Sequence, residues 1–260
     1  MNDERANGTC FGVMIALAVI SAIFIIAPHI PSFNDDVESK SFLMGDDFVD
    51  VDIRMGDLDG YIGGIYRVGT AYMFSNMYVT PNDPTVCKVY SLLEERMSGM
   101  SDSDKADYLL RFVHKNVDYY TDEHSYGIAD YVQMPAETLY LKRGDCEDVS
   151  FLLYTLYLKA GLDAVVVMNG SHVTVGVNVP CGQPNYIVHD GKRYYSAEAT
   201  CYYGIGMTTL DNPDIVIKPE SPQFPIFILA MALSGIVLLT VLEFKDKPVL
   251  KRFRKNTIGV

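Results

Sequence analysis

Three residues in the second half of the chain are of the types that a thiol enzyme uses, namely Cys146, His172 and Glu198. A cysteine nucleophile needs a base that takes its proton, and the base needs a third group that fixes its tautomer and stabilises its charge. Glutamate in place of the more usual aspartate adds one methylene of reach and leaves the chemistry unchanged. The residue types therefore fit a nucleophile, a base and an orienting carboxylate.

The segment around Cys146 predicts a helix that would hold its thiol in place. Asp145 fits an N-cap, residues 149–160 are mostly apolar, and Gly161 suits the left-handed residue that ends a helix. Cys146 then lies in the first turn, where free backbone N–H groups and the helix dipole favour a thiolate.

Two observations weigh against a reactive Cys146. A lone cysteine is commonly a small buried apolar residue, and this alternative stays open from the segment alone. In addition, Asp145, Glu147 and Asp148 place negative charge near the sulfur, which opposes thiolate formation.

After this helix the hydrophobic period changes from helical to two, as in strands. Residues 164–168, 172–179, 186–189 and 192–198 each predict a strand, with Asp190-Gly191 as the turn of a hairpin. Upstream, residues 84–97 and 101–117 predict helices, and residues 135–139 a short helical turn. Within the second of these helices, His114 is expected to be half-exposed and structural. Helices followed by an antiparallel sheet predict an α+β fold.

Several motifs in this part of the chain resemble the core of the transglutaminase-like superfamily, whose members share a papain-like thiol site. The pieces are Pro135-x-x-Thr138-Leu139, Gly144-Asp145-Cys146-Glu147-Asp148, the helix 152–161, His172-Val173-x-Val175 and Tyr194-Tyr195-x-x-Glu198-x-Thr200. With the upstream helix ending in Val117-Asp118-Tyr119, the resemblance covers residues 101–206. One departure is Val173, since the family often has an aromatic residue directly after the histidine.

The resemblance implies roles for individual residues: Cys146 as nucleophile, His172 as general base and acid, and Glu198 as the orienting carboxylate. It also implies acyl transfer through a thioester, which an amine or water then resolves. An oxyanion hole would use the backbone N–H of Cys146 and a second donor, for which Tyr120 and Gln133 are candidates.

Composition limits the partners of the chain. The protein has 260 residues and a formal net charge of -12, and residues 28–223 contain 14 Lys and Arg against 29 Asp and Glu. Such an acidic middle argues against nucleic acid as a partner. The five cysteines include no CxxC pair, and no Cys/His cluster has zinc spacing, so we expect neither a metal nor another cofactor.

Two uncharged apolar runs, residues 11–27 and 224–242, predict membrane spans, although the first could instead be a cleaved signal peptide. The basic residues after the second run predict a cytoplasmic tail, which would place the middle of the chain outside in either case. We thus expect a two-pass membrane protein with both termini cytoplasmic. Its expected parts are a short N-terminus 1–10, the span 11–27, a linker 28–45, an extracytoplasmic domain 46–223 with core 101–206, the span 224–242 and the tail 243–260.

The leading hypothesis is a membrane-anchored thiol enzyme that acts on peptide or carboxamide bonds of an external protein or peptide. Hydrolysis is favoured over cross-linking, because nothing in the sequence suggests a site that excludes water. A non-catalytic interaction module that keeps the fold is the alternative. A further hypothesis is processing of a neighbouring membrane protein or surface-layer component.

Overall fold

The fold comes from a computed structural model that describes residues 35–58, 75–127, 130–170, 172–210 and 213–220. These residues belong to one compact unit, residues 31–222. The predicted spans 11–27 and 224–242 lie outside the described residues. Among the helices that are described, none has the length and apolarity that a membrane crossing needs.

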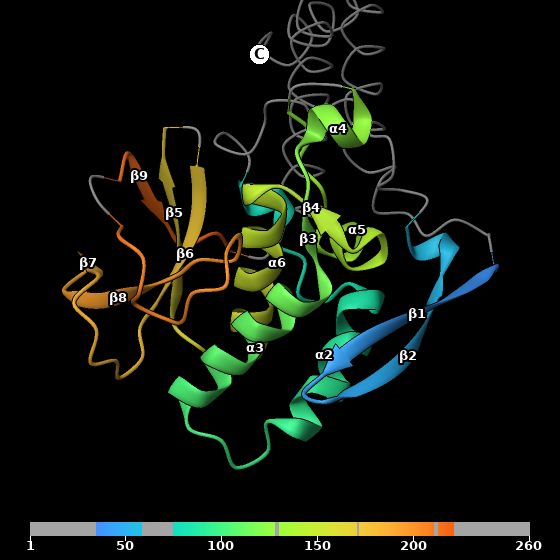
Figure 1. Ribbon diagram of the computed structural model, residues 1–260, viewed down its shortest axis with the longest axis horizontal. Helices are drawn as coiled ribbons and strands as arrows, with labels where there is room; N and C mark the ends of the chain where they lie inside the picture. The colour runs from blue at the N-terminus through green and yellow to red at the C-terminus, as the bar shows by residue number, and fades with distance from the viewer. Residues whose placement is uncertain (1–34, 59–74, 128–129, 171, 211–212, 221–260) are drawn as a thin grey trace, which may run out of the picture. The chain divides into compact units, whose positions relative to one another are not determined.

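A five-stranded antiparallel sheet forms one side of the described unit, with the strand order β7-β8-β6-β5-β9 (Figure 1). Its strands are β5 (Ala164–Asn169), β6 (His172–Val177), β7 (Tyr186–His189), β8 (Lys192–Ala197) and β9 (Ile215–Ile217). Alternate valines of β6 belong to the main core, while Val165, Val167 and Tyr194 form a second cluster. The sheet is therefore buried at its centre on both faces, and the predicted α+β fold is confirmed.

One helix, α6 (Cys146–Lys159), runs through the middle of the unit and packs on β5 and β6 (Figure 1). Its residues from Cys146 to Tyr157 are all buried. This explains why the helix itself carries apolar side chains on all of its faces. The other helices are α2 (Pro84–Arg96), α3 (Asp102–Asn116), α4 (Asp122–Tyr126) and α5 (Pro135–Leu141). Of these, α3 and α5 pack most closely against α6, so the helix that begins at Cys146 is fixed from several directions.

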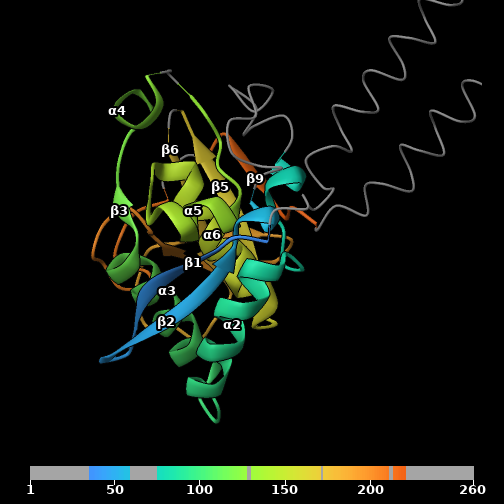
Figure 2. The same cartoon turned by 90° about the vertical axis from the view of Figure 1, so that its right-hand side faces the viewer.

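A hairpin of β1 (Val37–Met44) and β2 (Asp47–Arg54) lies against α2 and α3, on the side away from the sheet (Figures 1 and 2). Residues 37–44 were expected to belong to a linker, but they pair with β2 and bury Phe42 and Met44. The Asn116 amide accepts from the Leu43 N–H at 2.7 Å and donates to the Leu43 carbonyl at 2.8 Å. The hairpin is thereby attached to the end of α3.

Two very short strands bring the end of α3 next to the residues that precede Cys146. Strand β3 (Asp118–Tyr119) pairs in parallel with β4 (Arg143–Gly144), so the end of α3 lies beside the residues that precede α6. The Tyr120 N–H continues this pairing and donates to the Gly144 carbonyl at 2.9 Å. Segments that are far apart in sequence thus meet at the N-terminal end of α6.

Candidate active site

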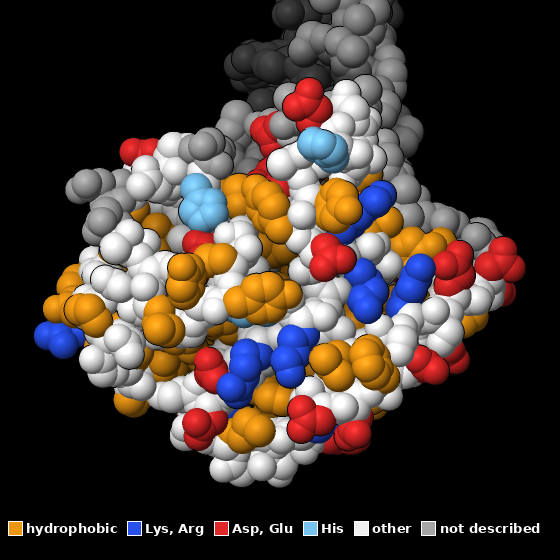
Figure 3. Space-filling view, in the orientation of Figure 1, with side chains coloured by type: hydrophobic (Ala, Val, Ile, Leu, Met, Phe, Trp, Pro, Cys, Tyr) orange, Lys and Arg blue, Asp and Glu red, His pale blue; other side chains and the backbone are white. Residues whose placement is uncertain are grey.

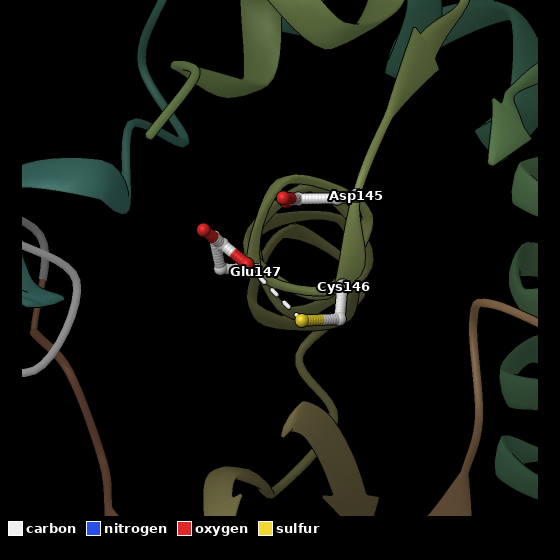
Figure 4. Close-up of side chains that lie close together, drawn as sticks. All are labelled: Asp145, Cys146 and Glu147. Atoms are coloured by element: carbon white, nitrogen blue, oxygen red, sulfur yellow. Dashed lines mark hydrogen bonds between the residues drawn. The ribbon is translucent and has the colours of Figure 1, made fainter. Parts of the chain in front are cut away.

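Cys146 is the first residue of α6, as the sequence predicts, and Asp145 occupies the N-cap position. The side chain is 7% exposed and its Sγ donates to Glu147 Oε2 at 3.1 Å (Figure 4). The backbone N–H of Val173, the residue after His172, also contacts the sulfur. The thiol therefore lies between the start of a helix and the start of a strand.

The surroundings of Cys146 favour the thiol over the thiolate in this structure. Burial raises the pKa of Cys146 most, and the charge and hydrogen bond of Glu147 raise it further. The Val173 N–H acts in the opposite direction without outweighing them. The acidic neighbours thus have the effect that the sequence predicts.

Asp148 explains why a glycine stands two residues before Cys146. Its carboxylate accepts from the Asp145 N–H at 3.3 Å and from the Gln133 N–H at 2.7 Å, which closes the start of α6 and attaches residue 133 to it. A Cβ on residue 144 would lie 2.6 Å from the Asp148 Cβ and 2.8 Å from its Oδ2. Gly144 is therefore required for the approach of the capping carboxylate.

His172 and Glu198, the predicted base and orienting carboxylate, are in direct contact. His172 is the first residue of β6, Glu198 directly follows β8, and Nε2 of the histidine lies 2.8 Å from Oε2 of the glutamate. The hydrogen bond to Glu198 raises the pKa of His172 despite partial burial. With Nε2 engaged in this bond, Nδ1 is the ring nitrogen left for proton exchange.

The carboxylate of Glu198 is held on its other side by Thr200. Both the N–H and the Oγ1 of Thr200 donate to Glu198 Oε1, at 3.1 and 2.7 Å. Burial raises the pKa of Glu198, but the hydrogen bonds from His172 and Thr200 outweigh it and lower the pKa overall. Glu198 is consequently fixed as an ion. The motif Glu198-x-Thr200 was visible in the sequence, although the role of its threonine was not assigned.

A second histidine supports Glu198 through the main chain. His114 Nε2 lies 2.8 Å from the Glu198 carbonyl oxygen, and the side chain is buried rather than half-exposed as expected. Burial lowers the pKa of His114, which favours the neutral ring. Nothing in the spacing along α3 indicates this contact, because it joins residues 84 positions apart.

The start of β6 is bonded to α6 through both backbone groups of Val173. The Ser150 Oγ donates to the Val173 carbonyl at 2.9 Å, and the N–H of Val173 contacts the Cys146 sulfur. Cys146 and Ser150 are one helical turn apart, so they face the strand together. The position of β6, and with it the backbone of His172, is set relative to Cys146.

The two oxyanion-hole candidates differ in their environment. The Gln133 side chain is 1% exposed, and neither its Nε2 nor its Oε1 has a hydrogen-bond partner in the described part of the chain. Tyr120 is exposed and its backbone N–H is already bonded to Gly144. Gln133 is thus the better candidate, since a buried amide without a partner is free to donate.

A cavity of about 150 Å³ adjoins these residues and is lined by His114, Val117, Asp118, Tyr119, Val149, Ala199, Thr200, Cys201 and Tyr202. Val149 is one turn after Cys146 on α6, and Tyr119 is near enough to Cys146 for the thiol to influence its pKa. On the face seen in Figure 1, apolar side chains form several patches with polar and charged side chains between them (Figure 3). Cys201 and Cys181 are both free. The cavity is a candidate subsite next to the thiol.

Comparison with known families supports the resemblance noted in the sequence. Residues 88–201 match the family model of a transglutaminase-like domain. The match includes Cys146, His172 and Glu198, and a transglutaminase-like domain suggests cysteine-dependent enzyme activity in general. No curated protein matches the chain.

Proposed function

We propose that the chain is a cysteine-dependent acyl-transfer enzyme that cleaves peptide or carboxamide bonds, with Cys146, His172 and Glu198 as its catalytic groups. The observation that carries the proposal is the bond between His172 Nε2 and Glu198 Oε2, formed at the start of the strand whose next residue contacts the Cys146 sulfur. A half-buried histidine bonded to a buried carboxylate, on the strand that contacts a thiol at a helix start, supports nucleophilic catalysis.

In the first step the Cys146 proton passes to His172, and the sulfur attacks the carbonyl carbon of the substrate. The new S–C bond forms while the C–N bond breaks, and the proton on His172 goes to the leaving amine. Glu198 stabilises the imidazolium through Nε2. The Cys146 N–H and the Gln133 Nε2 would bind the oxyanion of the tetrahedral intermediate.

In the second step, water or an amine gives a proton to His172 and attacks the thioester carbon. The S–C bond breaks, and the proton on His172 returns to the sulfur to restore the thiol. The His172 side chain is 45% exposed, so water has access to the base. This exposure supports hydrolysis over protein cross-linking, because a transferase must keep water from the thioester.

The cavity beside Cys146 supports a peptide-like substrate. Its walls combine Val117, Val149 and Ala199 with the exposed rings of Tyr119 and Tyr202. A small cleft with apolar walls and a few polar groups suits one side chain of an extended peptide. Val173 stands where related domains often have an aromatic residue, but it is a buried core residue and does not line this cavity.

We also propose, from the apolar runs at 11–27 and 224–242, that the enzyme is anchored in the membrane with its domain outside. The substrate would then be an external protein or peptide, such as a neighbouring membrane protein or surface-layer component. Proteolysis of sealed vesicles of known orientation tests this: an external protease should cut the domain while residues 243–260 stay protected.

Acylation by p-nitrophenyl acetate tests the chemistry without knowledge of the natural substrate. The full chain should release p-nitrophenolate in a burst and carry an acetyl thioester on Cys146, detected by mass spectrometry and cleaved by hydroxylamine. Adding methylamine distinguishes the acceptors, since a transferase would give N-methylacetamide in preference to acetate.

Cys146→Ser and Cys87→Ser form the matched pair for this experiment, because Cys87 lies on α2 and its thiol donates to the Pro81 carbonyl. The first variant should lose the thioester and the second should keep it. A folded wild-type chain that forms no thioester on Cys146 would instead support the non-catalytic interaction module.

A further inference from the structure

The cavity beside Cys146 is built by residues that follow directly on the proposed catalytic groups. Val149 is one turn after Cys146 on α6, and residues 199–202 come immediately after Glu198. The opposite wall comes from the end of α3 and from β3. A side chain bound in this cavity would therefore belong to a substrate residue close to the bond that is cleaved.

Three of the polar side chains that line this cavity can only accept hydrogen bonds from a ligand, and the first is Thr200. Thr200 uses both of its donors on Glu198, because its N–H and its Oγ1 donate to Oε1 at 3.1 and 2.7 Å. The hydroxyl oxygen of Thr200 consequently has only lone pairs to offer. The second is Asp118, whose carboxylate oxygens accept as well.

His114 supplies the third of these acceptors. Its Nε2 lies 2.8 Å from the Glu198 carbonyl oxygen, which can only accept, so this nitrogen carries the proton. Burial lowers the pKa of His114 and favours the neutral ring, in which the other nitrogen, Nδ1, has no proton. Nδ1 is therefore an acceptor on a side chain that lines the cavity.

Asp118 also gives the cavity a negative charge. The residue is exposed, and no Lys or Arg in the described part of the chain forms an ion pair with it, although Arg143 is its partner in the pairing of β3 with β4. The described residues that line the cavity include neither Lys nor Arg. A ligand group in this cavity therefore meets a carboxylate without a competing cation in the wall.

Aromatic rings and apolar side chains complete the walls. Tyr119 and Tyr202 are 51% and 80% exposed, and the ring of Tyr202 contacts that of His114 with centroids 5.3 Å apart. Rings of this kind attract cations over their faces. The apolar surface of Val117 and Val149 suits the methylene stem of a long basic side chain.

Building on the proposed acyl transfer, we propose that this cavity selects a cationic side chain, arginine or lysine, on the substrate residue whose carbonyl Cys146 attacks. A guanidinium and an ammonium carry N–H donors and no acceptor, so they match walls that offer acceptors and a carboxylate. An acidic side chain would instead bring its charge next to Asp118 and its acceptors against those of the wall.

Two esters with side chains of equal length test this selection on the full chain. They are the methyl esters of acetyl-arginine and acetyl-citrulline, of which citrulline is uncharged and has an oxygen that accepts. Arginine is preferred to lysine as a probe, because its guanidinium stays protonated and does not attack the thioester as an amine would. We expect kcat/KM to be about tenfold higher for the arginine ester, from chromatography of the released acids.

Asp118→Asn removes the charge and keeps the side-chain size. It should reduce the arginine-to-citrulline ratio to about threefold or less, whereas Asp50→Asn on exposed β2 should leave the ratio unchanged. Tyr202→Ala should reduce the ratio about twofold, and Tyr202→Phe, which keeps the ring, should retain it. Each ratio is taken within one protein, so a general loss of activity cancels.

Alkylation of Cys201 measures binding without any reaction of Cys146. Cys201 is a free thiol that lines the same cavity. In the Cys146→Ser chain, acetyl-arginine amide should slow the reaction of Cys201 with iodoacetamide more than acetyl-citrulline amide does, as measured by mass spectrometry. Adding Asp118→Asn should make the two amides equal.

Equal kcat/KM for the two esters, a preference for citrulline, or a full ratio in Asp118→Asn would overturn the proposal. If neither ester nor p-nitrophenyl acetate acylates Cys146, the proposed acyl transfer is wrong, and the protection of Cys201 then decides on the cavity alone. Equal protection by the two amides would overturn the selection of a cation.

Discussion

The two sides of the proposed active site differ in how their charges are balanced. On the sheet side, each oxygen of the Glu198 carboxylate has a partner, since His172 contacts one and Thr200 donates to the other. On the helix side, Cys146 stands among carboxyls that raise one another's pKa and that of the thiol. The base His172 therefore takes up a proton more readily, while the nucleophile Cys146 loses its proton less readily.

The sheet side is held by complementary groups of the domain itself. The positions of its side chains should therefore depend little on the composition of the solution. On the helix side, burial and neighbouring acids raise the pKa of Asp145 and of Cys146, so this side holds protons. Substitutions that disturb one side at a time should therefore have effects of different size, with the largest on the sheet side.

Replacement of His172 removes the balanced side and should have the largest effect. His172→Ala should slow acylation of Cys146 by p-nitrophenyl acetate about 10²- to 10³-fold, because the thiol loses its base. His189→Ala is the control, since His189 also faces a carboxylate, Asp190, at 3.5 Å but lies on β7. Similar rates for the two variants would contradict the role given to His172.

Replacement of Gly144 disturbs the helix side through packing. In Gly144→Ala the new methyl would lie 2.6 Å from the Asp148 Cβ, which should lower the free energy of unfolding by about 1–3 kcal/mol. Urea denaturation measures this. In Gly182→Ala nothing lies within 4 Å of the new Cβ, so less than about 0.5 kcal/mol should be lost. An unchanged stability of Gly144→Ala would mean that Asp148 can give way.

Replacement of Glu147 removes the acid that contacts the thiol. Glu147→Gln should lower the pKa of Cys146 and raise its alkylation by iodoacetamide near neutral pH about tenfold. The pH–rate profile, recorded with a chelator present, measures the shift. Glu123→Gln on the exposed side of α4 should leave the profile unchanged. A slower reaction of Glu147→Gln would show that the glutamate assists the thiol.

The smallest expected effect is the contribution of the His172–Glu198 pair to the pH dependence of the free energy of unfolding. The pKa of His172 is raised above its usual value of 6.5, so the contribution is complete below that pH and is lost as pH rises through the folded-state pKa. The pKa of Glu198 is lowered from 4.5, so its contribution is complete above that pH and is lost as pH falls through the folded-state pKa. The pair therefore stabilises most between about pH 4.5 and 6.5.

Glu198→Gln tests this window. Because His172 is 45% exposed, we expect a loss of only about 0.2–1 kcal/mol at pH 5.5, and a smaller difference from the wild type at pH 8.5. Urea denaturation at the two pH values provides the comparison. A difference that grows toward alkaline pH would contradict the assigned direction of the His172 pKa.

Local patterns predicted the elements that carry the reactive groups. The cap and glycine signals placed Cys146 in the first turn of α6, and the alternating valines placed His172 at the start of β6. Both features depend on neighbouring residues, so sequence alone specifies them. The assignment of Cys146, His172 and Glu198 as a catalytic triad stays a prediction until acylation is measured.

The contacts that adjust the site could not be predicted, because they join distant segments. His114 lies on α3 and reaches the carbonyl of Glu198, while Asp122 and Asp130 meet the carboxyls of α6. The pairing of β1 with β2 was missed as well, since residues 38–41 are polar and the strand buries only Phe42 and Met44. In each case tertiary packing, which no short pattern specifies, decides the outcome.

The two contacts between α6 and the backbone of Val173 matter for protein engineering. Cys146 and Ser150 engage the N–H and the carbonyl of this one residue, so sliding β6 along α6 would break both contacts together. The spacing of nucleophile and base is therefore independent of the lengths of the outer loops, such as the one between β6 and β7. Loops grafted from related domains should alter which substrates enter while the reaction itself is preserved.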